Sequence, residues 1–365
     1  MSNFEPEPGD VVTLQLSRQN IKFRIDASKI NPLFAHELEA GKAIIYRLVR
    51  QVAPKGEPGM YALKKFKHQY QDSSMPAICN SLAGFKRIPG LEVCERYCLT
   101  DTNATTLLKQ YEDLRYGILM PWISGDTWAD VRLTEANTQS KWQDPALCLM
   151  LAARLAERLA ELERRGIAHC DLSPGNMIFN PTTYDTQFID VEDMYAPGMA
   201  QPHSMTAGSP GYQHRSALNG LWCAEGDRFA AAVLIGEMVT FCDKTVRTAK
   251  HGEDSYFAPA ETQTGDVRNV RFLAMRDALA RLHSPAASLF ESAWAAPSLV
   301  DCPTMAQWGQ ALFNNRPPLP PIKDYQVFWK SFPTLDTKPE VTEFTPLLAE
   351  GSEPKPAGFK PWSLN

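Results

Sequence analysis

The sequence predicts an α+β protein in two unequal parts, a small β-rich part and a larger helical part, followed by a proline-rich tail. Three observations support this fold class. Short β-like runs occupy the first half of the chain, and the first long amphipathic helix pattern begins only after Asp144. The last 50 residues are crowded with prolines. A chain of 365 residues is long enough to bury a core in each of two parts.

The overall composition is that of an ordinary globular protein and argues against several classes of partner. Apolar residues make up 44% of the chain and charged residues 22%. The 37 basic and 42 acidic residues give a net charge of -5, which disfavours a main role in binding nucleic-acid phosphates or anionic lipid. We therefore expect no nucleic-acid partner and no membrane partner.

The chain also lacks targeting and disulfide signals. Its acidic start has neither the basic block nor the apolar block of a secretory signal, and its longest apolar run, 229–236, is too short to span a bilayer. Eight cysteines at irregular spacing do not form a disulfide framework, and Cys94 and Cys98 have no second Cys or His pair that would complete a zinc site. We expect reduced thiols and a cytoplasmic protein.

The first half reads as a series of short strands. Val11–Leu16, Ile44–Arg50 and Met60–Phe66 are β-like runs, and the turn signal at 55–59 predicts that the last two form a hairpin. A further apolar run at 114–122 is followed by the turn-like residues 124–126. These runs predict a sheet in the N-terminal part.

The second half is helical. Asp144 and Pro145 are a typical N-cap and first-turn pair, after which leucines recur at helical spacing until Gly166. A second helix is predicted from about Asp227 to Val239, and its nearly uncharged, alanine-rich sequence indicates burial on most sides. Beyond Arg316 the prolines and several aromatic residues predict an extended tail that docks on the domain, with a PxxP-binding partner as an alternative role.

The chemistry is concentrated directly after the first long helix, in the segment 167–179. There Asp171 is followed five residues later by Asn176, and an apolar run further along ends in Asp190. Phosphoryl transfer needs a carboxylate that orients the attacking hydroxyl and accepts its proton, and oxygen ligands that hold Mg²⁺. The pattern predicts Asp171 as the catalytic group and Asn176 and Asp190 as metal ligands.

In order and spacing, these segments resemble the C-terminal half of the kinase domain in the eukaryotic-type protein kinase superfamily. The chain resembles a divergent, bacterial member of that superfamily. His169-Cys-Asp171 resembles the H-R-D triplet, Asp190-Val-Glu192 resembles D-F-G, and 208–212 resembles G-T-P-x-Y. Asp227 matches the aspartate that braces the catalytic-loop backbone in that family. The resemblance covers about residues 35–315. It implies a two-lobed fold with an N-terminal extension (1–34), an N-lobe (35–122), a C-lobe (123–315) and a tail (316–365).

The resemblance is weaker in the N-lobe. Tyr61-Ala-Leu-Lys64 resembles the V-A-I-K strand, so that Lys64 is expected to contact the nucleotide phosphates, while Lys65 points to the opposite face as a solvated charge. Gly41 lies where a glycine-rich loop is expected, although alanines replace the other glycines. The segment from Met120 to Trp122 resembles the hinge whose backbone bonds adenine.

Several positions depart from the family pattern. No glutamate lies between Glu57 and Glu92, so the usual helix partner of Lys64 is missing, and Asp72 and Glu92 are both candidates to replace it. Ser173 occupies the position of a phosphate-neutralising lysine, and Glu192 replaces a glycine of the metal loop. In addition, His214-Arg-Ser216 stands in place of A-P-E.

The resemblance implies an enzyme that uses ATP and Mg²⁺, most simply a Ser/Thr protein kinase with a protein substrate. Two alternatives stay open at this stage. A small-molecule kinase resembling aminoglycoside phosphotransferases is favoured by Ser173-Pro174 and the acidic metal loop. A pseudokinase that binds nucleotide as a scaffold is favoured by the missing glutamate and the reduced number of glycines.

Overall fold

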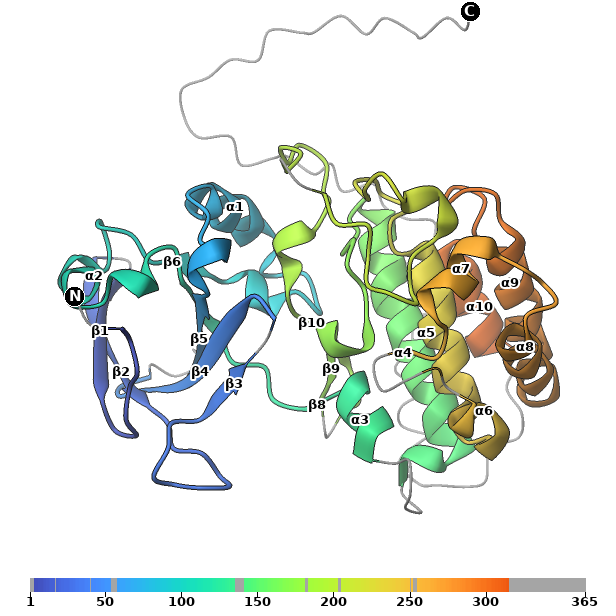
Figure 1. Cartoon of the computed structure of the whole chain (residues 1–365), viewed down its shortest axis with the longest axis horizontal. Coiled ribbons are helices and arrows are strands. Elements are labelled where there is room, and N and C mark those ends of the chain that lie inside the picture. The colour runs from blue at the N-terminus through green and yellow to red at the C-terminus, as the bar shows by residue number, and fades with distance from the viewer. Residues whose placement is uncertain are drawn as a thin grey trace, which may run out of the picture.

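The computed structural model describes residues 3–16, 18–39, 41–53, 58–134, 141–180, 183–202, 205–249, 251 and 255–314. Within these ranges it is a mixed α+β structure, with a curled sheet in the N-terminal part and helices in the C-terminal part (Figure 1). We call residues 3–122 the sheet region and 123–314 the helical region. The predicted tail at 316–365, with its docking and partner predictions, lies outside the described residues.

The larger sheet is antiparallel throughout its described pairs. Its strand order is β1-β2-β4-β5-β7-β6, and β3 pairs with β4 at one end. The predicted runs at Val11–Leu16 and Met60–Phe66 are confirmed as β1 and β5, and the predicted β4–β5 hairpin is confirmed as well. The strands are β1 (Val11–Leu16), β2 (Gln19–Ile25), β3 (Glu37–Glu39), β4 (Ala43–Arg50), β5 (Met60–Phe66), β6 (Tyr97–Cys98) and β7 (Ile118–Pro121).

The sheet curls because one of its faces encloses an apolar core of its own. Leu14 of β1, Phe23 of β2 and Leu63 of β5 are buried there together with Leu108 of the short helix α2 (Thr105–Gln110). The backbone N–H of Gln15 donates to the carbonyl of Asn103 at 2.9 Å, so β1 at one edge of the sheet meets the segment that follows β6, the strand at the other edge. Two strands of this sheet, β1 and β2, come from the segment predicted as an N-terminal extension (1–34).

The other face of β5 looks toward the helical region. Ala62 and Phe66 belong to the main core, together with Met75 and Leu82 of helix α1 (Met75–Leu82). Side chains alternate along a strand, so Lys64 lies on this same face. The sequence alternation thus places the lysine ammonium at the junction between the two regions.

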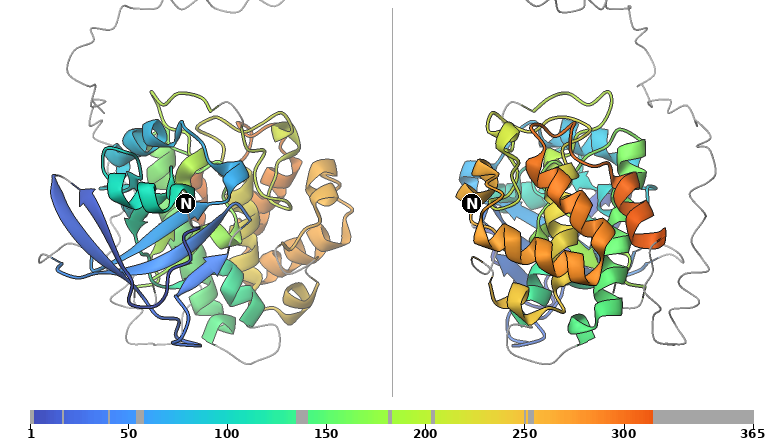
Figure 2. Two further views of the ribbon diagram at one scale, coloured as in Figure 1. Left: turned by 60° about the vertical axis from the view of Figure 1, so that its left-hand side comes forward. Right: turned by 90° about the vertical axis from the view of Figure 1, so that its right-hand side faces the viewer.

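The helical region is built around α5 (Arg228–Thr240), which packs against α4, α8 and α9 and is buried along nearly its whole length. The right-hand view of Figure 2 shows these helices from the side, packed next to one another. Asp144 accepts a hydrogen bond from the Ala146 N–H and begins α4, as predicted. The remaining helices, with α4 included, are α3 (Trp128–Thr134), α4 (Pro145–Arg164), α6 (Lys244–Thr248), α7 (Pro259–Thr264), α8 (Val270–Leu282), α9 (Ser284–Ala295) and α10 (Met305–Asn314).

A second, small sheet carries the site residues at the junction. Its strands are β8 (Asp126–Thr127), β9 (Met177–Phe179) and β10 (Thr186–Phe188), in the order β10-β9-β8. Gly125 has φ +148° just before β8, and a Cβ there would lie 2.0 Å from the Phe179 carbonyl oxygen. Only glycine therefore allows the connection from the sheet region to pass β9 at this distance.

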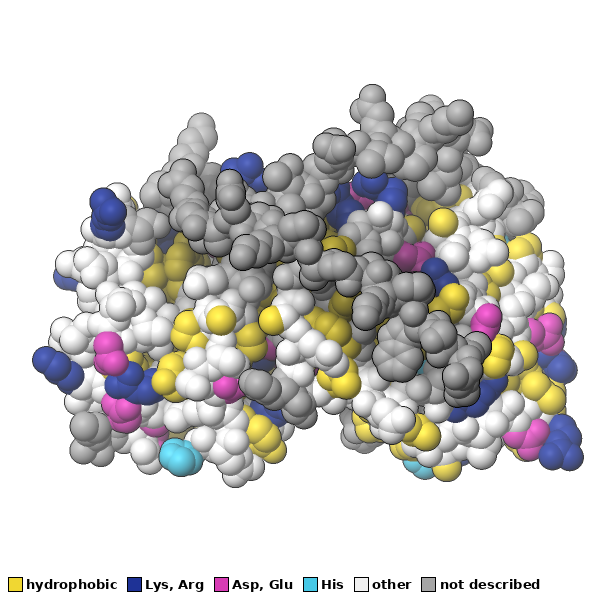
Figure 3. Space-filling view, turned by 90° about the horizontal axis from the view of Figure 1, so that it is seen from above, with side chains coloured by type: hydrophobic (Ala, Val, Ile, Leu, Met, Phe, Trp, Pro, Cys, Tyr) yellow, Lys and Arg dark blue, Asp and Glu magenta, His cyan; other side chains and the backbone are white. Residues whose placement is uncertain are grey.

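Seen from above, the molecular outline is notched between the sheet region and the helical region, and acidic and basic side chains are interspersed on this face (Figure 3). Short 3₁₀ turns complete the described structure: η1 (His68–Tyr70), η2 (Ala83–Phe85), η3 (Glu92–Cys94), η4 (Glu112–Leu114), η5 (Lys141–Gln143), η6 (Pro174–Asn176), η7 (Val191–Asp193) and η8 (Arg215–Ala217). Among the described residues, none of the helices has the length and apolarity needed to cross a bilayer. All eight cysteines lie within the described ranges and are free thiols.

Candidate active site

The loop between α4 and β9 is held by a buried aspartate at the start of α5. The carboxylate of Asp227 accepts hydrogen bonds from the backbone N–H groups of His169, at 2.6 Å, and Cys170, at 2.9 Å. It therefore bonds the loop rather than capping its own helix. Burial raises the pKa of the Asp227 carboxyl, although His169 and these two N–H groups act in the opposite direction. This is the bracing role that the sequence resemblance implied for Asp227.

The residue before the candidate catalytic aspartate has an unusual backbone conformation. Cys170 has φ +64°, in the left-handed region that costs a non-glycine residue about 1 kcal/mol or more. Its side chain is 1% exposed, and burial raises the pKa of its thiol well above the ordinary value. Cys170 is thus a structural residue of the loop and not a nucleophile.

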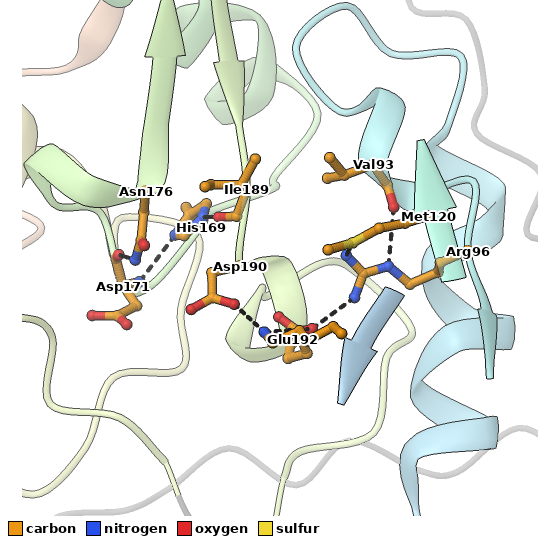
Figure 4. Close-up of polar contacts among 10 residues, drawn as sticks. Val93, Arg96, Met120, His169, Asp171, Asn176, Ile189, Asp190 and Glu192 are labelled. Carbon is orange, nitrogen blue, oxygen red and sulfur yellow. Dashed lines mark hydrogen bonds and ion pairs between the residues drawn. The ribbon is translucent and has the colours of Figure 1, made fainter. Parts of the chain in front are cut away.

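The imidazole of His169 joins the two loops of the site. Its Nε2 lies 2.8 Å from the Ile189 carbonyl oxygen, and its Nδ1 accepts the Asp171 backbone N–H at 3.3 Å (Figure 4). The imidazole is completely buried. These contacts give His169 an architectural role, because they tie the two loops together.

Asp171 and Asn176 are held next to each other. The amide nitrogen of Asn176 donates to the Asp171 carbonyl oxygen at 2.8 Å, which leaves the amide oxygen of Asn176 available as a ligand (Figure 4). The Asn176 carbonyl accepts the Ile189 N–H at 3.0 Å, so Asn176 is also tied to the strand end that leads to Asp190. One carboxylate oxygen of Asp171 accepts a hydrogen bond from the Ser209 hydroxyl at 2.8 Å.

Asp190 follows β10 at the junction and contacts Lys64 from the sheet region. The carboxylate of Asp190 is 49% exposed, and its backbone is left-handed with φ +61°. The ammonium of Lys64 donates to Asp190 Oδ1 and to Glu192 Oε1, the latter at 3.1 Å. The structure therefore brings together Lys64 and Asp190, which are 126 residues apart in the sequence.

The partner of Lys64 is neither of the two residues that the sequence offered. Asp72 bonds the backbone and hydroxyl of Ser74, while Lys64 pairs with Asp190 and Glu192. Burial of Lys64 lowers the pKa of its ammonium, but the carboxylates of Glu192 and Asp190 outweigh this effect and raise that pKa. Glu192, from the 3₁₀ turn η7 after β10, thus takes the place of the expected helix glutamate as a partner of Lys64.

Glu192 has a second cationic partner, Arg96, which the sequence reasoning did not identify. Arg96 is 5% exposed, and its Nη1 donates to Glu192 Oε1 at 3.1 Å (Figure 4). Burial would raise the pKa of the Glu192 carboxyl, but Lys64 and Arg96 hold that pKa well below its usual range. The available signal was an arginine in the segment 91–99, where apolar residues alternate with Glu92, Glu95 and Arg96, since a buried charge requires a partner.

Lys65, expected as a solvated charge, is engaged on the opposite face of β5. Its ammonium donates to the Phe4 carbonyl at 2.9 Å and to Asp113 Oδ2 at 3.1 Å, and its side chain is only 12% exposed. The direction of Lys65 was predicted correctly, but its solvation was not. The reason is that the N-terminal segment folds back over this face.

Of the residues in the sheet region that were predicted to contact nucleotide, only some are open to a ligand. A Cβ on Gly41 would meet nothing within 4 Å, so the turn before β4 is open there. Met120 is buried on β7, opposite Ala62, and its sulfur accepts a contact from Arg96 Nη2 at 3.6 Å. The Trp122 N–H donates to the Met60 carbonyl at 3.1 Å, so in this structure it is engaged within the sheet rather than directed at a ligand.

The oxygen donors at the junction suit a magnesium–nucleotide complex better than a metal site made by protein alone. The described residues contain no group of three His, Cys, Asp or Glu side chains that could hold a metal ion. Asn176 and Asp190 offer one amide and one carboxylate oxygen, and Mg²⁺ commonly keeps waters and phosphate oxygens around so sparse a set. Burial raises the pKa of the nearby Asp193 carboxyl; Lys42 acts in the opposite direction, and Asp171, Glu192 and Asp190 raise that pKa further.

The end of the segment after η7 is anchored in the helical region. Tyr212 donates to the buried Glu237 at 2.8 Å, and Arg215 donates to the carbonyls of Trp294, at 2.9 Å, and Ala295, at 3.0 Å. These carbonyls are the unpaired ones at the C-terminus of α9, where positive charge is favourable. Arg215 therefore holds the residues that stand in place of A-P-E.

A scan against models of known protein families found no match to this chain. A search of curated proteins found no significant match either.

Proposed function

We propose that this chain is an ATP- and Mg²⁺-dependent phosphotransferase with a divergent, two-lobed kinase-like fold, acting in the cytoplasm on serine or threonine hydroxyls of a protein. The observation that carries the proposal is the contact of Lys64, from the sheet region, with Asp190, beside the paired Asp171 and Asn176. A cation and three oxygen-bearing side chains thus gather where the two regions meet. Such a set can bind a nucleotide polyphosphate with its metal.

Each side chain has a role in this proposal. Lys64 contacts the α- and β-phosphates, while the amide oxygen of Asn176 and the carboxylate of Asp190 hold Mg²⁺, which supplies positive charge beside the phosphate oxygens when bound. Asp171 orients the acceptor hydroxyl and takes its proton. The turn at Gly41 and the strand end from Met120 to Trp122 line the nucleotide side in the same proposal.

A protein substrate is supported by the contact at Asp171. The Ser209 hydroxyl donates to Asp171 Oδ1 at 2.8 Å, so a serine side chain fits the position that an acceptor hydroxyl needs. The acidic metal loop had favoured a small-molecule kinase, but Glu192 of that loop is engaged by Lys64 and Arg96. This engagement removes one of the two reasons for the small-molecule alternative.

The test is Asp171→Asn with radiolabelled ATP, Mg²⁺ and a cell lysate as the source of acceptors. We expect wild type to label protein, and the variant to lose about 100- to 10,000-fold of the rate while it still binds nucleotide. Asp144→Asn is the matched control, because Asn and Asp are equivalent N-caps and Asp144 lies at the start of α4.

The outcomes separate the alternatives. Label that appears only in small solutes favours the small-molecule kinase. Nucleotide binding without any transfer favours the pseudokinase. A fully active Asp171→Asn protein contradicts the role given to Asp171.

A further inference from the structure

Arg96 is a buried cation in which each of the three guanidinium nitrogens has a partner. Its Nε donates to the Val93 carbonyl at 3.0 Å, its Nη1 to Glu192 Oε1 at 3.1 Å, and its Nη2 to the Met120 sulfur at 3.6 Å (Figure 4). The side chain itself is 0% exposed. A guanidinium buried to this degree is stable only when it is paired with a negative charge. Among the described residues, Glu192 is the carboxylate that forms an ion pair with Arg96.

Glu192 receives both cations on the same oxygen. Lys64 Nζ and Arg96 Nη1 each lie 3.1 Å from Glu192 Oε1. Lys64, Arg96, Glu192 and Asp190 together carry two positive and two negative charges, and we call these four residues the Lys64 network. Arg96 comes from the segment before β6 and Glu192 from the metal loop, so the network joins the sheet region to the helical region.

Within this network the two carboxylates differ in exposure. The Asp190 side chain is 49% exposed, whereas that of Glu192 is 15% exposed and enclosed between two cations. Under the proposed function, Asp190 turns to the metal, and Glu192 is then the carboxylate that still holds Lys64. The orientation of Glu192 at that moment depends on its other partner, Arg96.

We propose that Arg96 is a positioning residue for the reaction, which through Glu192 fixes the ammonium of Lys64 where it meets the phosphates. This inference rests on the proposed function, because it assumes that Lys64 contacts nucleotide. Helix α1 contains no acidic residue that could hold Lys64. In this inference, Glu192 holds Lys64 instead, and Arg96 holds Glu192. Outer-shell partners of this kind change activity by about 10- to 100-fold when removed.

The experiment compares Arg96→Met, Arg96→Lys, Glu192→Gln and the double variant Arg96→Met/Glu192→Gln in the full chain. Arg96→Met is expected to raise the KM for ATP and to lower kcat/KM about 10- to 100-fold, with partial rescue by Arg96→Lys. Because both residues act on Lys64 through the same contact, the double variant is expected to lose no more than Glu192→Gln alone. Purely structural damage would instead lower the thermal stability of the variants without raising the KM for ATP.

Arg271→Met is the matched control. Arg271, like Arg96, donates its Nε to a carbonyl, that of Ala249 at 2.9 Å, and its Nη1 to a carboxylate, that of Glu261 at 2.6 Å. It lies on α8 and contacts none of the Lys64 network. We expect this variant to be less heat-stable than wild type but to keep its kcat and KM.

The possible failures are distinguishable. If wild type is active and Arg96→Met keeps at least half of the wild-type kcat/KM, the inference is wrong and the proposed function stands. Strictly additive losses in the double variant also overturn the inference. If wild type transfers no phosphate and binds no nucleotide, the proposed function fails and the inference fails with it. Should Arg96→Met not fold, the near-isosteric Glu192→Gln must still raise the KM for ATP, and an unchanged KM overturns the inference.

Discussion

Asp227→Asn tests how the candidate catalytic loop is held. The Asp227 carboxylate accepts the His169 N–H at 2.6 Å and the Cys170 N–H at 2.9 Å, and the side chains of these residues are almost completely buried. Asparagine has nearly the same shape but keeps only one acceptor oxygen, so its NH₂ group faces one of the two N–H donors. Cys170, which has φ +64°, then loses a contact that maintains its left-handed backbone.

The expected cost follows from these two bonds. A buried N–H left without an acceptor costs about 1–3 kcal/mol, and replacing a charged acceptor by a neutral one weakens the remaining bond by about 1 kcal/mol. The sum is about 2–4 kcal/mol. For a region of this size the midpoint of thermal unfolding falls by roughly 2–4 °C per kcal/mol, so we expect a decrease of about 5–15 °C. At temperatures where the variant is folded, we expect phosphoryl transfer to fall more than tenfold, on the order of a misplaced catalytic group.

The assay is thermal unfolding followed by circular dichroism, combined with kcat measured well below the lower midpoint. Asp144→Ala serves for comparison, since it removes one carboxylate-to-backbone bond from α4 and costs about 1 kcal/mol without contacting the loop. The reasoning is refuted if Asp227→Asn unfolds at a higher temperature than Asp144→Ala, or if it keeps the wild-type kcat.

Three further predictions concern the residues around the loop. Glu237→Gln neutralises a buried carboxylate that lies 3.9 Å from Arg132. We expect the free energy of unfolding, measured in urea, to fall by about 3–5 kcal/mol, and a fall of less than about 1 kcal/mol would contradict the buried-pair argument. Arg215→Ala removes the donor to the last carbonyls of α9 and should cost about 1–3 kcal/mol by the same assay, with Arg215→Lys intermediate; equal stability of the three proteins would show that the contact contributes nothing. Ser209→Ala should change kcat less than tenfold. Ser209→Asp should lower kcat more than tenfold, because it places a second carboxylate beside Asp171. Equal kcat values for the two variants would argue against the observed contact.

Local sequence signals predicted much of the fold. The alternation in β5 gave the correct direction of Lys64 and Lys65, and the Asp144-Pro145 pair with its leucine spacing gave the start of α4. These features depend on residues close in sequence, and a period of two or of 3.6 residues is therefore sufficient. The contact between Asp227 and the loop backbone was implied by the family resemblance and not by a local pattern.

The partners of charged residues could not be predicted in the same way. Glu192 was noted only as a replacement for glycine. Asp72 and Glu92 were both candidate partners of Lys64, because no glutamate lies between Glu57 and Glu92. Pairing of buried charges is decided by which side chains meet across the junction, and this information is tertiary. The same reason applies to Lys65, whose partners Phe4 and Asp113 are 61 and 48 residues away.

The closed curl of the sheet region has a consequence for the way in which the chain reaches its folded state. Gln15 and Asn103 meet only after the residues between them have been made, and the core of the curl also needs Leu107 and Leu108 of α2. Contacts of such separation form slowly, because the entropy of closing a long loop opposes them. During synthesis the apolar side chains of β1 and β2 therefore remain exposed until about ninety further residues have been added to the chain. Fragments that end before α2 are expected to aggregate rather than to fold.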